Sequence, residues 1–311
     1  MTPLALALLA FACGDDDATS TEATTAPADF PAADGMTLDQ IAGEATETDL
    51  VAAPTVQVLE PGENRYAFGL FAVTGETVTD AEVALYAARP NGKATGPFPA
   101  SSTSLVTEPA FASATTTNDP DAATYLYDAE VDLPAKGEWR MLAMVRQDDG
   151  AYAYTVMPSA VVGKGAGVPD VGEPAPEIHT PTAEDVGGDL SQIDTRQPPD
   201  TMHDVDYAEV LGEEPIVLSF ATPALCTSRV CGPVVDIAEQ VKNERPGDAA
   251  FIHMEIYTDN DVNKGVNEQV RTFGLPSEPW LFVIDSDGKV SSRLEGAFTK
   301  AELDAALDRV S

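Results

Sequence analysis

The chain has 311 residues, of which 43% are hydrophobic, and its 52 acidic against 17 basic residues give a formal net charge of −35. This length allows two domains with a core in each. A surface so negative repels the phosphates of nucleic acids and of anionic lipids, so the composition excludes a nucleic-acid partner. Such acidity is typical of a very soluble protein or of one in a salty environment.

The first 13 residues predict an export signal. The apolar run from Leu4 to Ala12 is too short to cross a bilayer, and it ends at Cys13. The small residues before Cys13 and the Gly-Asp-Asp-Asp after it resemble the lipidation box of bacterial lipoproteins. The resemblance implies a lipid anchor on Cys13 that holds the protein on the extracytoplasmic side of the cell membrane. The two remaining cysteines are then free to pair in an oxidising compartment.

Residues 14–54 consist mainly of Ala, Thr, Asp and Glu and contain neither Lys nor Arg. A segment of this composition repels itself and buries too little apolar surface to fold. It is predicted to be a disordered acidic tether.

Residues 55–163 alternate between apolar and polar side chains, as half-buried strands do. The clearest run is Trp139, Met141, Ala143 and Val145, and the turn after it at 148–150 predicts a hairpin. Short strands without helices predict an all-β domain that resembles bacterial immunoglobulin-like sandwiches. Residues 95–121, rich in Ser, Thr and Pro, are predicted to form a long loop. No His or Cys lies between Gly14 and Glu177, so this domain is expected to be a spacer or a partner-binding platform.

Residues 164–200 read as a linker and an irregular lead into the last domain, because Gly and Pro interrupt them repeatedly. From residue 201 onward, apolar runs of strand type alternate with apolar residues at helical spacing. The strands are predicted at 216–220, 249–257, 280–285 and 289–294. Helical spacing follows Pro233 and recurs over 262–273, and the last helix begins with the capping box of Thr299 and Glu302. The predicted order is strand, helix, strand, helix, hairpin, helix.

Two cysteines, Cys226 and Cys231, lie where the first of these strands passes into a helix. The free N–H groups of a helix start carry partial positive charge and favour a thiolate, which is the reactive form of cysteine. Arg229, between the two cysteines, would either favour the thiolate further or be solvated. The alternative is a non-enzymatic binding module in which the pair is a structural disulfide.

This order of elements, with a thiol pair at the first strand–helix junction, resembles the thioredoxin-like superfamily over residues 171–311. The segment from Val171 to Pro176 is similar to the Gly-x-x-Ala-Pro motif of its redoxin and extracytoplasmic thiol–disulfide exchange branches, and Pro279 matches its cis-proline. The resemblance implies an α/β domain with a central sheet flanked by helices. It also implies a thiol–disulfide oxidoreductase that uses Cys226, Cys231 and Pro279, with protein thiols, disulfides or a redox protein as partner. The redox-active disulfide then takes the place of a cofactor.

The spacing Cys226-x-x-x-x-Cys231 differs from the Cys-x-x-Cys of thioredoxins, so the attacking cysteine stays open. Aligning Cys231-Gly232-Pro233 with Cys-Gly-Pro makes Cys231 the attacking residue. A register similar to peroxiredoxins makes it Cys226 in a thiol peroxidase, but Ser219 and Pro223 stand where that family has its proline and threonine. Ser219 also takes the position of thioredoxin's buried acid.

The chain has three histidines, His179, His203 and His253. With Met202, Met254 and the thiols they resemble, loosely, the site of copper-delivery members of the superfamily, since thiol and thioether ligands suit Cu(I). A Cu(I) chaperone with His179 and His203 as ligands is therefore an alternative. His253 lies within an apolar strand and is expected to be a satisfied core residue.

Overall fold

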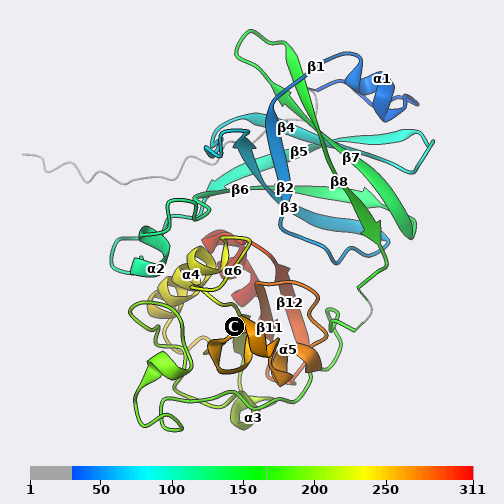
Figure 1. The fold of residues 1–311 in the computed structure, drawn as a ribbon. Coiled ribbons are helices and arrows are strands. Elements are labelled where there is room, and N and C mark those ends of the chain that lie inside the picture. The colour runs from blue at the N-terminus through cyan, green and yellow to red at the C-terminus, as the bar shows by residue number, and fades with distance from the viewer. Residues whose placement is uncertain (1–29, 166, 311) are drawn as a thin grey trace, which may run out of the picture.

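The computed structural model describes residues 30–165 and 167–310, which form an eight-stranded and a four-stranded sheet (Figure 1). The predicted signal segment with Cys13 lies outside the described residues. In the part of the chain that the structure describes, no helix has the length and apolar character needed to cross a membrane.

The N-terminal β domain is one curled sheet with the strand order β1-β8-β7-β4-β5-β6-β3-β2. Its strands are β1 (Thr46–Glu47), β2 (Leu50–Pro54), β3 (Gly62–Ala72), β4 (Glu82–Ala88), β5 (Ala94–Ser104), β6 (Tyr125–Leu133), β7 (Gly137–Arg146) and β8 (Tyr152–Val162). The first half of β5 pairs with β4 and its second half with β6, so β5 turns the sheet over the core. A bridge between Leu59 and Val162 closes the curl on the other side. The predicted all-β domain is confirmed, and its immunoglobulin-like type stays a prediction.

The predicted tether is wrong for residues 30–54. Helix α1 (Leu38–Ala42) starts at a capping box formed by Thr37 and Gln40, and β1 and β2 follow it. Phe30, Leu38 and Ile41 are at most 5% exposed, because they pack on the outer face of β4 and β7. A few apolar side chains among acidic ones therefore suffice to anchor this segment, although its overall composition indicates disorder.

The loop predicted at 95–121 is also partly wrong, since 94–104 form strand β5. Strand β4 pairs with the first half of β5 and β6 with the second half, and this pairing between distant segments outweighs the loop-like composition of Ser, Thr and Pro. The connection between β5 and β6 is limited to residues 105–124, and it contains the short helix α2 (Ala114–Thr117).

The C-terminal domain has the sheet order β10-β9-β11-β12, with β9 and β10 parallel and β11 antiparallel to both of its neighbours. Its strands are β9 (Ile216–Phe220), β10 (Ala250–Met254), β11 (Trp280–Ile284) and β12 (Val290–Glu295). Its helices are α3 (Tyr207–Val210), α4 (Cys231–Glu244), α5 (Glu268–Thr272) and α6 (Lys300–Leu307), with 3₁₀ turns at Leu190–Gln192, Thr258–Asn260 and Val262–Lys264. The predicted order is confirmed, except that the helix expected over 262–273 is a 3₁₀ turn followed by the short α5.

Successive side chains of the central strands point to opposite faces of this sheet. Val217, Leu281 and Val283 face α4 and α6, and Leu218 and Phe282 face α5. Figure 1 shows α4 and α6 on the side nearer the β domain and α5 on the far side. The residues predicted as a linker are not free of the domain, since the backbone of 172–175 hydrogen-bonds to that of 288–290.

The two domains share one apolar core, which runs from β3 and β6 through α4 and α6 to the sheet behind them. Polar contacts reinforce the interface. The Arg65 guanidinium pairs with Glu302 and donates to the Ala297 carbonyl at 2.7 Å, and Glu295 accepts the backbone N–H groups of Gln57 and Val58 at 2.9 and 2.8 Å. The β domain therefore packs directly on α6 and on α4, the helix that begins with Cys231.

Candidate active site

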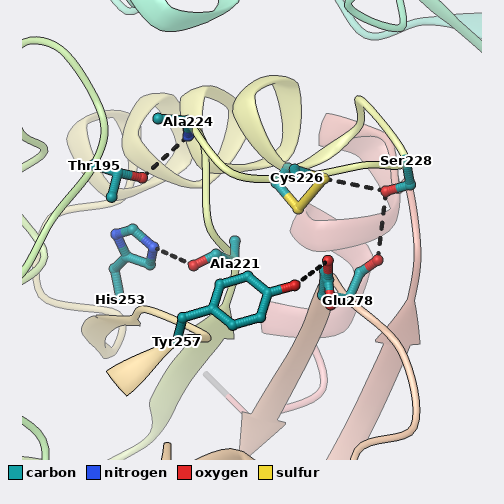
Figure 2. The surroundings of a disulfide bond; sticks show 9 residues. Thr195, Ala221, Ala224, Cys226, Ser228, His253, Tyr257 and Glu278 are labelled. Carbon is teal, nitrogen blue, oxygen red and sulfur yellow. Dashed lines mark hydrogen bonds between the residues drawn. A yellow bond between two sulfur atoms is a disulfide. The ribbon is translucent and has the colours of Figure 1, made fainter. Parts of the chain in front are cut away.

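Cys226 and Cys231 form a disulfide at the junction that the sequence indicates (Figure 2). Strand β9 ends at Phe220, a loop covers 221–230, and α4 begins with Cys231 itself. The Cα atoms are 6.0 Å apart, within the range that a disulfide spans. The two predicted residues are thus brought together.

The two cysteines differ in exposure. Cys231 is fully buried in the first turn of α4, whereas Cys226 on the loop is half-buried. An incoming thiol therefore meets Cys226 first.

The loop before β11 lies beside Cys226, and its Glu278–Pro279 bond is cis, as predicted. The link is Ser228, whose hydroxyl lies 3.1 Å from Cys226 Sγ and donates to the Glu278 carbonyl at 3.5 Å (Figure 2). Pro279 is buried directly behind this carbonyl. The structure therefore places the third predicted residue next to the loop of the disulfide.

Glu278 adds an ionisable group to this region that sequence reasoning missed. Burial raises the pKa of its carboxyl, and the Tyr257 hydroxyl, 3.4 Å from Oε1, lowers it by a smaller amount. Ser219, in the position of the buried acid of thioredoxins, is buried and its hydroxyl has no hydrogen-bond partner. The position just before Pro279 was the only available signal for Glu278.

The loop of the disulfide is fastened to the β domain through Arg229. This residue has a left-handed backbone with φ of 63°, and its carbonyl accepts the N–H of Ala123 at 3.0 Å. Its guanidinium pairs with Asp119 at 3.5 Å and with Asp121. Arg229 thus points to carboxylates of the β domain. Beside it, a cavity of about 650 Å³ lies between residues 227–230 and strand β3 with the start of β6.

Helix α4 is approached closely by the β domain at its first turn. A Cβ atom at Gly232 would lie 2.7 Å from Thr116 Oγ1 of α2, which is shorter than real contacts allow. The residue after Cys231 therefore has to be glycine for α2 to sit on the helix start.

The histidines lie in two separate places. The side chain of His179 is 81% exposed, and Asp206 at 2.6 Å raises its pKa. His203 and His253 are buried with Asp194 and Asp200, and this group is the only one among residues 30–165 and 167–310 that could hold a metal ion. The structure therefore does not bring the two copper candidates, His179 and His203, together, and neither cysteine joins the group. His253 is a satisfied core residue as predicted, since both of its ring nitrogens have partners.

No protein-family model matches the chain, and no curated protein sequence matches it. Among solved structures, it is similar to one from Chlorobium tepidum assigned as thiol:disulfide interchange protein DsbE, with 16% identity and a TM-score of 0.32 over 46% of this chain and 99% of that one. A thioredoxin family thiol:disulfide interchange protein from Chlorobium tepidum TLS gives 21% identity and a TM-score of 0.29 over 44% and 94%. The thioredoxin-like superfamily protein SPOA0173 gives 15% and 0.27 over 34% and 85%.

The topology of the C-terminal domain itself identifies its fold. Strands β9 and β10 are parallel, β11 and β12 form an antiparallel hairpin, α4 and α6 cover one face and α5 the other. A disulfide ends the loop after β9, and a cis-proline opens β11. The C-terminal half of this chain is a thioredoxin-like domain.

Proposed function

We propose that this protein is an extracytoplasmic thiol–disulfide oxidoreductase that acts through Cys226 and Cys231. The observation that carries the proposal is the unequal exposure of the two cysteines, with Cys226 half-buried on the loop and Cys231 buried at the start of α4. A purely structural disulfide needs no such asymmetry, whereas exchange needs one sulfur open to a partner and one held in reserve.

The chemistry follows from this asymmetry. A partner thiolate attacks Cys226 Sγ, the Cys226–Cys231 bond breaks, and Cys231 leaves as a thiolate in the first turn of α4. A second partner thiol, after losing its proton, attacks the mixed disulfide at the partner's sulfur, which releases the oxidised partner and leaves Cys226 as a thiolate. In the reverse direction Cys226 attacks a partner disulfide and Cys231 resolves it. Between the two registers that the sequence leaves open, the burial of Cys231 favours Cys226 as the attacking residue.

Two neighbours support this role for Cys226. In the reduced protein the Ser228 hydroxyl, 3.1 Å from Cys226 Sγ, would turn its single proton from the Glu278 carbonyl to a Cys226 thiolate. The second neighbour is the loop of Pro279, along which the backbone of a partner would lie. The nitrogen of Pro279 has no N–H and so donates no hydrogen bond there.

The proposal includes the location of the protein. We place the chain outside the cytoplasm, held by a lipid on Cys13, with the β domain as an immunoglobulin-like platform for a partner protein. Replacing Cys13 by Ser should release the protein from membranes and leave its redox chemistry unchanged. A Cys13→Ser protein that stays in the membrane fraction contradicts the anchor and leaves the exchange reaction unaffected.

The exchange reaction is tested by trapping. Reduced Cys231→Ser protein, mixed with insulin as a disulfide probe, should accumulate a mixed disulfide through Cys226, and Cys226→Ser should accumulate none. Non-reducing electrophoresis with mass spectrometry of the linked peptide measures both. The reduction potential of the wild-type pair, titrated against glutathione, should lie above about −300 mV. A lower potential together with no trapped species would identify a structural disulfide.

A further inference from the structure

A buried cluster of two carboxylates and two imidazoles lies beside β10, apart from the cysteines. Asp194, Asp200, His203 and His253 are each at most 2% exposed, and one ligand atom from each lies within 4.8 Å of the others. His203 Nε2 is 3.5 Å from Asp194 Oδ2 and 3.4 Å from Asp200 Oδ1. His253 Nδ1 is 2.7 Å from Asp200 Oδ2 and 3.8 Å from Asp194 Oδ1.

The hydrogen bonds of the protein satisfy three of these side chains and leave out the fourth. His253 contacts Asp200 with Nδ1 and the Ala221 carbonyl with Nε2, the latter at 3.2 Å. Asp194 accepts the backbone N–H groups of Arg196 and Asp200, and Asp200 accepts that of Met202. Neither ring nitrogen of His203 has a hydrogen-bond partner. Buried polar atoms are nearly always paired, so His203 is the side chain that needs an explanation.

We propose that Asp194, Asp200, His203 and His253 bind a divalent transition-metal ion, with Zn²⁺ the best fit. Two imidazole nitrogens and two carboxylate oxygens form a tetrahedral set with ligand bonds of about 2.0–2.2 Å, which places the ligand atoms about 3.3 Å apart. His203 Nε2 lies at about this spacing, 3.4 and 3.5 Å, from one oxygen of each carboxylate. His253 Nδ1 lies 2.7 and 3.8 Å from the other oxygen of each, so the carboxylates rotate to offer one oxygen to the ion as it enters. Cu(I) fits less well, because it prefers thiolate and thioether ligands and none of the four ligands is one.

The surroundings of the cluster have the features of an outer coordination shell. Metal-bound histidines usually donate their second N–H to a carbonyl or carboxylate, as His253 does to Ala221, and metal-bound carboxylates are themselves hydrogen-bonded, as Asp194 and Asp200 are. The charges also balance. The two carboxylates neutralise a dication, and the Arg196 guanidinium pairs with Asp236 instead of with them. Glu255, two residues along the chain from His253, accepts the N–H of Thr195.

An ion in this position would fasten three segments to one another. It would join the irregular stretch 194–203 to β10 through His253, and His253 in turn contacts the loop that leads from β9 to Cys226 (Figure 2). Thr195, next to Asp194, accepts the N–H of Ala224 in the same loop at 3.1 Å (Figure 2). The site is therefore structural, and it stands whether or not the disulfide exchanges with a partner.

The test uses untagged, oxidised full-length protein, in which the cysteines are bonded to each other. After chelation and dialysis, the protein is titrated with Co²⁺ and with Zn²⁺ and followed by calorimetry, visible absorption and melting temperature. We expect one equivalent of either metal to bind, with the strong visible bands of tetrahedral cobalt and a higher melting temperature. His203→Ala should lose all three signals. His179→Ala is the matched control and should keep them.

Asp200→Asn provides a near-isosteric second variant in case His203→Ala fails to fold, and it should weaken binding at least tenfold. The proposal is overturned if wild-type protein binds no stoichiometric metal, or if either cluster variant binds it as well as the wild type. Binding that appears only after reduction, with thiolate-to-cobalt charge-transfer bands, would assign the metal to the cysteines and also overturn it.

Discussion

Arg196 and Asp236 form an ion pair inside the protein, with Nε and Oδ1 2.8 Å apart and both side chains at most 5% exposed. The pair joins elements of both domains. Asp236, on α4, also accepts the N–H and the hydroxyl of Ser113 of the β domain at 3.0 and 3.2 Å. Arg196 donates to the carbonyl of Phe111 at 2.6 Å. Buried hydrogen bonds of the Arg196–Asp236 ion pair thus connect α4, the helix that starts with Cys231, to the β domain.

Replacing Asp236 by Ala should destabilise the fold strongly, because the Arg196 guanidinium and the Ser113 N–H would be left buried without an acceptor. We expect a loss of about 3–5 kcal/mol in the free energy of unfolding, measured by urea denaturation. Asp39→Ala is the control, since Asp39 pairs with Arg140 on the exposed surface at 3.0 Å and such pairs contribute about 0–1 kcal/mol. Equal effects of the two substitutions would mean that the buried pair does not hold the domains together.

Arg229 offers a test of the backbone of the redox loop. Both Arg229→Gly and Arg229→Ala remove the ion pairs with Asp119 and Asp121, but only glycine relieves the left-handed conformation at φ of 63°. The glycine variant should therefore be more stable than the alanine variant by about 1 kcal/mol. Denaturation of the two oxidised variants measures the difference. Equal stability would contradict the left-handed conformation.

Gly232→Ala should destabilise the protein although alanine favours helices, because its Cβ would meet Thr116 Oγ1 at 2.7 Å. We expect a cost of about 1–3 kcal/mol from overpacking. Adding Thr116→Ala removes the clashing oxygen and should restore part of the stability, so the two substitutions should couple in a double-mutant cycle. If the costs simply add, α2 does not press on the start of α4.

Glu278 should make stability depend on pH in the acidic range. Burial raises the pKa of its carboxyl above the ordinary 4.5, so the folded state holds this proton more tightly than the unfolded state. Its contribution to stability is therefore complete below pH 4.5 and is lost as the pH rises through the raised pKa. Glu278→Gln cannot ionise, so its unfolding free energy should fall less than that of the wild type over this range. Parallel curves for the two proteins would show that Glu278 titrates as a solvated carboxyl.

The sequence predicts those parts of the structure that depend on local patterns. Spacing or residue type predicts three elements that the structure contains. They are the strand at 216–220, the helix that begins at Cys231 and the helix that follows the capping box at Thr299. The disulfide between Cys226 and Cys231 and the cis bond at Pro279 agree with the expectation from the resemblance to the thioredoxin-like superfamily.

The remaining features depend on contacts between distant segments, which no local pattern reveals. Strand β5 exists because β4 and β6 flank it, and α2 gains its position from α4. The Asp–His cluster forms where residues 194–203 lie along the edge of β10, held there by the hydrogen bond from the His253 N–H to the Met202 carbonyl and by that from the Thr195 N–H to Glu255. In sequence, its four members look like unrelated residues of a Pro-rich stretch and a strand.

The apolar core shared by the two domains has a consequence for how the protein moves and unfolds. Two domains that move about a flexible hinge need hydrophilic surfaces where they face each other. Here, separation of the domains would expose the apolar, buried faces of α4 and α6 to water. We therefore expect both halves to melt in a single cooperative transition, and a fragment cut after β8 to aggregate. The disulfide then stays at a constant distance from the β domain, so a protein bound to that domain would be presented to Cys226 without any rearrangement.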